Sequence, residues 1–598
     1  MFSTITRASC LLLQMCSSTG WGHTTVWEGS LINILDKIRT IARVIHWRLT
    51  WNKFDLHYPV PVPDNPKFMT AWDAAGLIPD GAVIGTSGMA GNQRCAVLYR
   101  AIRDRFKQEG HPRNLTVLTV GGQGGRGRVP GTIEELALEG LNTRMITGHT
   151  ETYKGQLRLA EEKKIDLHCS LLGMMTLIFR EQGEGRNYYI SDTGAGTFID
   201  PRTARGTPLY SPDGTQYVEV TQDGRFKYSL PPVDTALFNA PAADRKGNIY
   251  FKKAAVIGDS FAVAKAAKYN NGRTIVNVGE LVEEGYDEPF LPAEYVDAVV
   301  YWPKTEQTVA IKYDEYWDCF TPHSTTKLEE GLDRIRLINK ILGIMPRRAP
   351  VDDILARLAT RVFTDHARKG DVVDIGTGLP EEVARLLYES GVMQELRMLT
   401  EAGVFGGVAT PGIFFGAAVN PDRVVPSCEA FDQIYDRLDW AILGCLQADS
   451  QGNVNVSNRG PGIMNYVGPG GFIDLTTAAD NILFVSSWGT GAEIKVQGES
   501  VKLLEPGEPK FVDEMFEITF NGQEALKRNK NVYYVTHIGA FKLTPRGMEL
   551  IYVMPGIDPQ KEIIDACEMK IVLPESGAPE VVGPDVVTGQ GFRFELNE

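Results

Sequence analysis

The sequence predicts an α/β protein with two tandem open lobes of similar topology, each a mainly parallel sheet with crossover helices. Two observations support this: short apolar runs alternate with helix-periodic segments, and the order of elements in the first half recurs in the second. Glycine-rich loops follow several of the runs, as they do where strands end in an open sheet. The 598 residues suffice for several cores at about 150 residues per domain.

Composition narrows the class of protein. Hydrophobic residues make up 43% and charged residues 23%, which is typical of a globular chain. The net charge of −14 argues against a nucleic-acid binder, although it leaves room for a local basic pocket. No apolar run approaches about 18 residues, so no membrane span is expected. The eight cysteines are scattered without CxxC or ligand-like spacing, which indicates reduced thiols in an intracellular protein.

Residues 1–65 are predicted to form an N-terminal extension. Residues 1–27 lack Asp and Glu and weakly resemble a mitochondrial presequence, so the matrix is the alternative to a cytoplasmic location. Residues 30–51 have helical periodicity with basic residues between the apolar ones, and we expect this helix to pack on the protein's own surface, the alternative being a membrane. The apolar positions are Leu31, Leu35, Ile38, Ala42 and Ile45, and the basic ones Lys37, Arg39, Arg43 and Arg48.

The first lobe is predicted to span residues 66–330. Its expected helices are 71–77, 93–106, 153–164, 171–181 and 254–268, its strands are 83–84, 115–120 and 274–278, and residues 204–232 read as hairpins with turns at 212–214 and 223–224. Gly122–Gly127 matches the dinucleotide pattern GxGxxG. Because Pro130 follows and no helix opens from the glycines, a nicotinamide cofactor is not expected.

A connector, 331–350 with a helix at 334–342, leads to the second lobe at 351–575, and residues 576–598 are predicted as a C-terminal tail. The second lobe repeats the first: helix 354–366, a strand ending at Ile375, a Gly-rich loop, helix 381–390 and a strand at 396–400. Three stretches match in type and order. They are 81–88 with 370–378, 115–125 with 396–407, and Ala243–Ile249 with Ala448–Val454, both of pattern A-D-x-x-G-N-[IV]. Two like lobes favour a ligand site between them.

Glu401 is the most informative single residue. It ends an apolar run, and Gly403, Gly406 and Gly407 follow it, as in a strand that turns at the carboxyl edge of a sheet. The first copy has only Thr119 or Val120 at this place, so the turn itself does not require a carboxylate. The alternative interpretation is a strand-end glutamate that is solvated or in a salt bridge.

A carboxylate serves as a base, a metal ligand or a nucleophile. No acidic or histidine ligands cluster with Glu401 in sequence, so a metal is not expected. A nucleophilic carboxylate needs an activated acyl partner and N–H donors for the oxyanion that forms. The glycines at 403–407 and Gly468-Pro-Gly-Gly471 are candidate donors, the alternative for each loop being a tight turn.

Several motifs together resemble the family I CoA-transferases, closest to the 3-oxoacid, acetate or propionate type with both halves fused in one chain. The matching stretches are Glu401–Gly407, Gly468–Asp474, Gln451–Val456, Gly196–Arg202 and Pro555–Asp558, and the resemblance covers Lys67 to Pro574. The resemblance implies NagB/RpiA-like lobes and a ping-pong exchange. Glu401 would attack an acyl-CoA thioester to give an acyl-glutamyl anhydride, and the released CoA would convert it to a glutamyl-CoA thioester. A second carboxylic acid would reverse these steps.

In that scheme coenzyme A is a substrate and no metal or redox cofactor is required. The sequence departs from the family at Thr400–Gly403, where relatives have Glu-Ser-Gly or Glu-Asn-Gly, so the acyl donor and acceptor stay open. Residues 1–65 have no counterpart in compact bacterial members. Two alternatives stay open beside the transferase: an acyl-CoA hydrolase, in which water resolves the intermediate, and a non-catalytic ligand-binding protein.

The predicted catalytic residue is Glu401. Predicted substrate or CoA-binding residues are Gly403, Gly406, Gly407, Gly470, Gly471, Gln123 and Asn92, the last two with a turn or helix cap as the alternative. The predicted partners are acyl-CoA and carboxylic acids of short-chain fatty acid or ketone-body metabolism. The resemblance suggests a homo-oligomer, while the duplication lets one chain build a complete two-lobe site.

Overall fold

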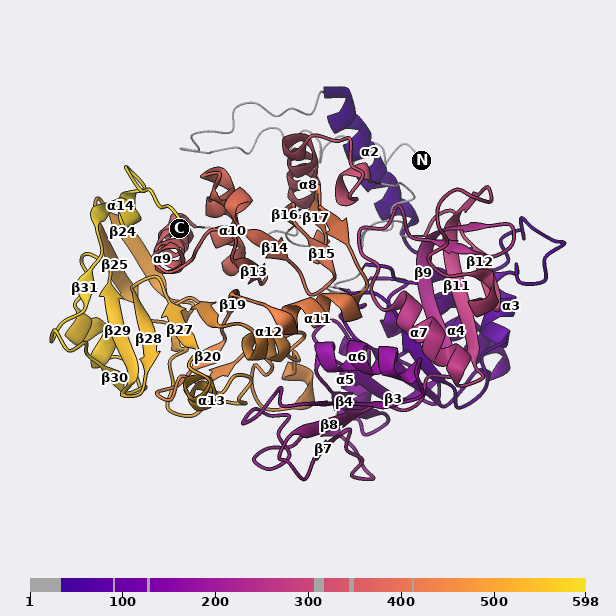
Figure 1. The fold of residues 1–598 in the computed structure, drawn as a ribbon, viewed down its shortest axis with the longest axis horizontal. Coiled ribbons are helices and arrows are strands. Elements are labelled where there is room, and N and C mark those ends of the chain that lie inside the picture. The colour runs from indigo at the N-terminus through magenta and orange to yellow at the C-terminus, as the bar shows by residue number, and fades with distance from the viewer. Residues whose placement is uncertain (1–33, 90–91, 126–128, 306–316, 344–348, 411–413) are drawn as a thin grey trace, which may run out of the picture.

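A computed structural model describes residues 34–598 except 90–91, 126–128, 306–316, 344–348 and 411–413. Two large sheets organise it, one in the indigo and magenta part of Figure 1 and one in the orange and yellow part, with helices packed on them. This confirms the predicted α/β class with mainly parallel sheets. The possible presequence at 1–27 lies outside the described residues. No described helix is long and apolar enough to cross a membrane.

The first sheet has the order β12-β11-β9-β1-β2-β3-β4-β6, with β10 paired to β9. Its strands are parallel except β6 and β10, and nearly all their residues from β1 to β4 and in β9 are buried, as parallel strands covered on both faces require. Bounds are β1 Val83–Thr86, β2 Leu115–Thr119, β3 Asn142–Thr147, β4 Asp166–Cys169, β6 Pro208–Tyr210, β9 Thr235–Asp244, β10 Ile249–Tyr250, β11 Arg273–Val282 and β12 Ala298–Tyr301.

Crossover helices cover this sheet. They are α3 Ala71–Gly76, α4 Ala96–Glu109, α5 Lys154–Glu161, α6 Leu172–Gln182 and α7 Ser260–Tyr269. Helix α6 is apolar nearly all round and buried along most of its length, because it lies between the two lobes and contacts α7 on one side and α11 on the other. A small antiparallel sheet, β5 (Tyr188–Ser191), β8 (Phe226–Ser229) and β7 (Val218–Val220), follows α6.

The second sheet has the order β18-β15-β14-β13-β19-β22-β27-β28-β29-β30, with β31 also paired to β29. Bounds are β13 Val372–Ile375, β14 Arg397–Leu399, β15 Val404–Phe405, β18 Arg423–Val424, β19 Trp440–Gly444, β22 Asn481–Val485, β27 Asn531–Val535, β28 Gly539–Thr544, β29 Gly547–Val553, β30 Ile571–Val572 and β31 Glu580–Val581. Two-residue and hairpin pairs lie beside it: β16 Val408–Ala409 with β17 Ala418–Val419, β20 Gln447–Ala448 with β21 Val454–Asn455, β23 Gly489–Thr490 with β26 Glu508–Pro509, and β24 Glu493–Gln497 with β25 Ser500–Glu505.

The remaining helices are α8 Leu328–Leu342, α9 Pro350–Thr364, α10 Pro380–Glu389, α11 Ser427–Asp436, α12 Phe472–Ala478, α13 Gly522–Lys527 and α14 Pro584–Thr588. Helix α9 begins with Pro350 at its first position and Asp352 accepting a hydrogen bond from the Ala349 backbone N–H at 2.7 Å, two N-terminal signals visible in sequence. Helix α14 packs on α9 and β31 pairs with β29, so residues 580–588 of the predicted tail pack on the second lobe.

The two sheets share five parallel strands in the same order: β2-β1-β9-β11-β12 in the first and β14-β13-β19-β22-β27 in the second. The register is also shared. Ile84 pairs with Val117 in the first lobe and Val373 with Met398 in the second.

The A-D-x-x-G-N-[IV] match is a structural turn in both lobes. The Asp244 carboxylate accepts from the backbone N–H of Lys246 and of Asn248 at 2.9 and 3.0 Å, and Asp449 accepts from Gln451 and Asn453 at 2.9 Å each. In both turns the asparagine side chain donates to the second carboxylate oxygen at 2.8 Å. This internal repeat therefore extends to individual hydrogen bonds.

Some local predictions were wrong. The segment 204–232 contains one hairpin, β7–β8 around Asp223-Gly224, whereas β6 pairs antiparallel with β4 instead of forming a hairpin at 212–214. The long strand β9 was missed because it carries Pro241 and four alanines, a composition that disfavours a strand unless tertiary packing buries it. The helix expected at 254–268 begins only at Ser260.

The N-terminal helix α2 (Ile34–Thr50) contacts α8, in agreement with the expectation that it packs on the protein's own surface. The predicted contact face is wrong, however. Thr40 and Val44 are buried, and Val44 with Trp47 joins an apolar cluster that includes Trp317, Phe320 and Leu332. Leu35, Ile38, Ala42 and Ile45, which were named from sequence, lie on the opposite, exposed side, because the helix docks through its narrower stripe of Thr40, Val44 and Trp47. Leu31 lies outside the described residues.

Candidate functional site

Glu401 lies directly beyond β14, at the carboxyl edge of the second sheet beside the end of β13. From the shared register, Val117 corresponds to Met398, so three residues further Val120 corresponds to Glu401. Val120 is fully buried and apolar. The carboxylate is thus a feature of the second lobe alone, placed where open α/β sheets bind ligands.

The three glycines after Glu401 are required by the path of the chain. All have positive φ, between 67° and 86°, which favours glycine. A side chain at Gly403 would meet the Val425 carbonyl at 2.1 Å, and one at Gly407 would meet the Val419 carbonyl at 2.4 Å. The N–H groups of Gly403 and Gly406 donate to Thr400 O and Met398 O at 2.9 and 2.8 Å. These two amides therefore shape the turn, and neither is directed at a ligand.

Gly471 is the glycine that touches the carboxylate. Its N–H donates to the Glu401 side chain, and a Cβ at Gly471 would lie 1.7 Å from Glu401 Oε2. The loop that carries it is docked on the first lobe: the Gly470 N–H donates to Gly148 O at 2.8 Å, and the Thr150 N–H donates to Val467 O at 2.8 Å. The donor to Glu401 is therefore positioned by contacts between the lobes.

Two further carboxyl groups surround Glu401. Asp374, at the end of β13, accepts the Glu401 backbone N–H. Asp474, in the first turn of α12, accepts from the Tyr435 hydroxyl at 2.7 Å and from the Gly173 N–H at the start of α6 at 3.0 Å. A side chain at Gly173 would come within 2.5 Å of that carboxylate, so the approach of α6 requires glycine.

The environment of these carboxyls raises their pKa values. Burial, followed by the charges of Asp374 and Asp474, raises the pKa of Glu401 to about 8, although the Gly471 N–H opposes the shift. Burial raises the pKa of Asp374 and of Asp474 to about 7. A strongly shifted carboxyl at the carboxyl edge of a sheet is typical of a reactive group.

Gln123 and Asn92 are fully buried, and their side chains bond to protein groups. Gln123 Nε2 donates to Ser87 O at 2.8 Å and its Oε1 accepts from Tyr99 at 2.5 Å. Asn92 Nδ2 donates to Met89 O at 3.0 Å and, across the lobes, to Phe415 O at 3.1 Å. These contacts are those of residues that hold loops in place. A substrate-binding role for either stays a prediction.

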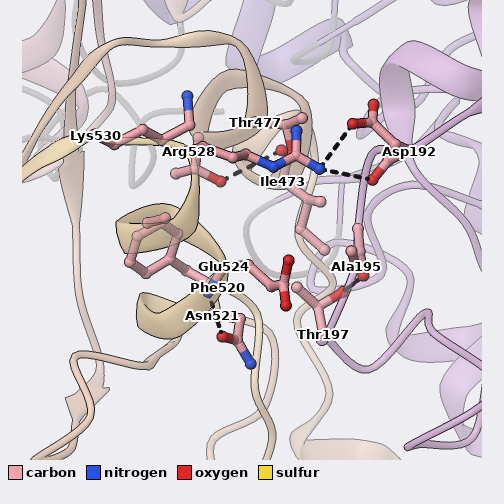
Figure 2. Close-up of a pocket in the computed structure, with 13 residues that line it drawn as sticks. Asp192, Ala195, Thr197, Ile473, Thr477, Phe520, Asn521, Glu524, Arg528 and Lys530 are labelled. Atoms are coloured by element: carbon pink, nitrogen blue, oxygen red, sulfur yellow. Dashed lines mark hydrogen bonds and ion pairs between the residues drawn. The ribbon is translucent and has the colours of Figure 1, made fainter.

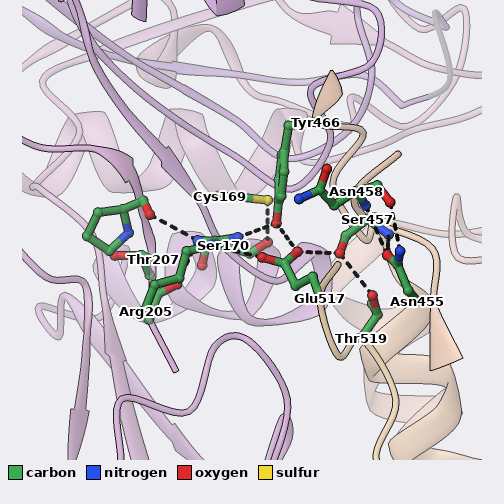
Figure 3. Close-up of polar contacts among 12 residues, drawn as sticks. Cys169, Ser170, Arg205, Thr207, Asn455, Ser457, Asn458, Tyr466, Glu517 and Thr519 are labelled. Carbon is green, nitrogen blue, oxygen red and sulfur yellow. Dashed lines mark hydrogen bonds and ion pairs between the residues drawn. The ribbon is translucent and has the colours of Figure 1, made fainter. Parts of the chain in front are cut away.

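A polar cluster joins the lobes near the Gly468–Gly471 loop (Figure 3). Arg205 of the first lobe forms an ion pair with Glu517 at 3.0 Å, donates to the Tyr466 hydroxyl and packs over the Phe198 ring at 4.3 Å. Tyr466 donates to Glu517 at 2.8 Å, and Ser457 donates to the same carboxylate. Phe198 belongs to the Gly196–Arg202 motif, and Tyr466 leads into the Gly468–Gly471 loop. The two motifs therefore meet across the interface.

A small cavity of about 30 Å³ also lies between the lobes, lined by Asp192–Thr197 on one side and by parts of 473–477 and 520–530 on the other (Figure 2). Arg528 bridges its rim to Asp192 at 2.8 Å. Burial lowers the pKa of Lys530 to about 8. Glu401 does not line this cavity.

Sequence reasoning missed Asp374 and the position of Asp474. A signal for Asp374 existed, since it is the last residue but one of a predicted strand, at the place where the first lobe has Gly85. Asp474 was part of a quoted motif, but its partner Gly173 lies 301 positions away in sequence.

No family model matches the chain. The caffeate CoA-transferase of Acetobacterium woodii is 32% identical over 513 residues, which cover 83% of this chain and 93% of that enzyme. The acetate CoA-transferase YdiF of Escherichia coli K12 is 29% identical over 521 residues, covering 84% and 92%. The chain belongs to the CoA-transferases.

Solved structures agree with this CoA-transferase assignment. The acyl-CoA transferase YdiF apoenzyme of Escherichia coli O157:H7 superposes with a TM-score of 0.78 at 25% identity, over 90% of this chain and 99% of that chain. The same enzyme as a thioester complex with CoA gives a TM-score of 0.77 at 26% identity, over 89% and 98%. The CoA-transferase described here is therefore an enzyme of the EC 2.8.3 class, with acyl-CoA and carboxylic acids as the implied substrate classes.

Proposed function

We propose that this CoA-transferase moves CoA reversibly between a short-chain acyl-CoA and a free carboxylic acid, through a glutamyl-CoA thioester on Glu401. The observation that carries the proposal is the meeting of Glu401 with the Gly471 N–H at the carboxyl edge of the second sheet. The Gly471 N–H donates to one oxygen of the Glu401 carboxylate, and the other oxygen is then free to attack a thioester carbonyl. A relative whose structure is a thioester complex with CoA supports the same chemistry.

The steps balance without a cofactor. A Glu401 oxygen attacks the acyl-CoA carbonyl, the C–S bond breaks, and CoA leaves as thiolate from an acyl-glutamyl anhydride. The thiolate then attacks the glutamyl carbonyl, so that the first carboxylate departs and Glu401 carries CoA. A second carboxylate attacks the glutamyl-CoA carbonyl, and CoA leaves as thiolate from a new acyl-glutamyl anhydride. The thiolate then attacks the acyl carbonyl of this anhydride, so that the new acyl-CoA forms and the Glu401 carboxylate is released. Remote binding energy from the CoA tail drives the strained anhydride steps.

The chain supplies two groups for this sequence. In the proposed steps the Gly471 N–H, which donates to the Glu401 side chain, stabilises the oxyanion that forms on the glutamyl carbonyl. A fixed donor of this kind is worth about 3 kcal/mol. The raised pKa of Glu401 makes the carboxylate, once ionised, a stronger nucleophile than an ordinary glutamate. The acceptor range is proposed as short-chain acids, and the caffeate and acetate relatives define the acids to try first.

Intact mass spectrometry tests the proposal. The protein is mixed with acetyl-, propionyl-, acetoacetyl- or caffeoyl-CoA, and any adduct is mapped by peptide. We expect a CoA-sized gain on the peptide with Glu401, lost in Glu401→Gln and kept in Glu575→Gln, a matched change at an exposed glutamate. A gain on another residue, or transfer by Glu401→Gln, would contradict the proposal. Release of CoA without an acceptor acid would instead identify a hydrolase.

A further inference from the structure

Helix α2 exposes a continuous apolar stripe. Ile34, Leu35, Ile38, Ile45 and Leu49 are 73%, 64%, 57%, 44% and 73% exposed, whereas most large apolar side chains of this protein are buried. At 100° per residue these positions, together with exposed Ala42, fall within an arc of about 100°. A face of this width is typical of a helix that buries one side, yet nothing in the described residues covers it.

The opposite side of the helix is already occupied. Thr40 and Val44 are buried, and Val44 packs with the cluster around Trp317 and Phe320 next to α8. Figure 1 shows α2 alongside α8 at the outer edge of the molecule, away from the two sheets. The stripe therefore faces outward from a helix that is anchored to the enzyme.

Basic residues border the stripe. Lys37 and Arg48 lie along one side and Arg39 and Arg43 along the other, and Asp36 is the single acidic residue of the helix. This positive segment belongs to a chain with a net charge of −14. Arg48 also stacks on the Trp51 ring at 3.7 Å, at the end of the helix. Basic flanks beside an aliphatic stripe suit the headgroup region of an anionic bilayer.

A second copy of the chain fits this face less well. Two α2 helices meeting stripe to stripe would bring their basic borders together, and like charges across an interface cost affinity. No described helix, α2 included, is long and apolar enough to cross a membrane. The exposed face of α2 therefore suits a helix that lies on a bilayer surface.

We infer that α2 docks this CoA-transferase on an anionic lipid bilayer, with the stripe in the headgroup region and the two lobes outside. Glu401 and the contacts between the lobes take no part in the docking. Binding therefore depends on the apolar stripe and on ionic strength.

Vesicle co-sedimentation of the full chain tests the inference. Vesicles of phosphatidylcholine alone are compared with vesicles containing 30% phosphatidylserine. We expect the bound fraction to be at least about tenfold higher on the anionic vesicles at low salt, and to fall as salt is raised. The variant Ile38→Glu/Ile45→Glu/Leu49→Glu is expected to lose this binding. Because all three positions are exposed, its transferase activity in solution should match that of the unchanged protein.

A matched control carries the same charge change at exposed apolar positions elsewhere, Leu504→Glu/Phe516→Glu/Val581→Glu. It is expected to bind vesicles like the unchanged protein, apart from a small uniform loss from added negative charge. Absence of vesicle binding by the unchanged protein would overturn the inference. So would equal binding by the stripe variant, equal binding to uncharged vesicles, or a dimer that forms without lipid and disappears in the stripe variant.

Discussion

The two lobes have the same five-strand core but differ at the carboxyl edge. The first lobe has Gly85 as the penultimate residue of β1 and Val120 beyond β2, where the second has Asp374 in β13 and Glu401 beyond β14. The first lobe extends its sheet with parallel β3 and β4, and the second turns back through antiparallel β15 and β18. The scaffold is therefore stable without carboxylates at this edge. Their presence in one lobe supports the chemistry proposed at Glu401, and the other lobe contributes Gly148 and Gly173 as supports.

The largest loss of activity is expected when Glu401 of the second lobe is replaced by valine, the residue at the equivalent position 120 of the first lobe. Glu401→Val removes the proposed nucleophile, so transferase activity should fall by about 10³-fold or more. The measurement is the rate of CoA transfer to a free acid. Val408→Ala on the nearby β16, a half-buried apolar position, serves as the control and should keep most activity. Activity of Glu401→Val within about tenfold of the unchanged protein would contradict the assignment.

Glu401→Val should not be less stable than the unchanged protein at alkaline pH. Because the folded pKa of Glu401 is raised to about 8, the folded protein holds this proton more tightly than the unfolded chain does. The free energy of unfolding of the unchanged protein therefore falls as pH rises from about 4.5 to about 8. Above about pH 8 the loss that comes from ionising Glu401 is complete. We expect Glu401→Val to raise Tm relative to the unchanged protein by about 1–3 °C more at pH 9 than at pH 5, by calorimetry.

The reciprocal change should damage folding and not chemistry. Val120→Glu buries a carboxyl group in a fully apolar position of the first lobe, which costs about 2–4 kcal/mol of unfolding free energy. Denaturant unfolding measures this loss. Val120→Thr, of nearly equal volume, should cost less than half as much. Equal stability of Val120→Glu and the unchanged protein would mean that Val120 is not equivalent to the Glu401 position.

The pH dependence should respond to Asp374. The reactive form of Glu401 is ionised, so adduct formation with acyl-CoA should rise with pH and level off above about 8. Asp374→Asn keeps an oxygen for the Glu401 N–H but removes a like charge, so the rising limb should move to lower pH by about half a unit to one unit. Stopped-flow rates of adduct formation give the profile. Asp513→Asn at an exposed position should leave it unchanged, and a shift to higher pH in Asp374→Asn would contradict the electrostatic account.

The smallest effect is expected at the two equivalent turns, one in each lobe, that begin at Asp244 and Asp449. Asp244→Asn and Asp449→Asn each weaken the same pair of backbone hydrogen bonds, so each should cost about 1 kcal/mol of unfolding free energy. Because Asp244 also accepts from the buried Tyr250 hydroxyl at 2.9 Å, Asp244→Asn should have the slightly lower denaturant midpoint. A much larger cost in one lobe would show that the turns have acquired different roles.

The sequence predicted the elements that carry strong local patterns. The apolar runs at β1, β2 and β13, the helices after them and the lobe repeat all follow from periodicity, and the repeat also distinguished Glu401 from an ordinary strand end. Strand β9 was not predictable from its own residues, because only burial between β1 and β11 makes an alanine- and proline-containing run extended. The apolar face of α2 was visible in the sequence. Which face of α2 packs on the protein depends on α8 (Leu328–Leu342), which lies too far along the chain for a local pattern to reveal the contact.

The support of Glu401 was also beyond local pattern. Gly173 and Asp474, or Gly148 and Gly470, come together only when the lobes dock, and no single-chain periodicity links them. The Gly468–Gly471 motif identified the loop, while the structure identified which of its amides reaches the carboxylate. Gly471 was therefore found by sequence as one of several glycines, and its distinct contact required the three-dimensional arrangement.

The docking of the Gly468–Gly471 loop on the first lobe has a consequence for how the site is assembled. Both lobes belong to one chain, so they meet at an effective concentration set by the connection and not by the amount of protein in solution. The donor to Glu401 is thus in place in every folded molecule, without an association step between lobes. Because the two lobes cannot dissociate from one another on dilution, we expect no loss of specific activity from that cause when the enzyme is diluted.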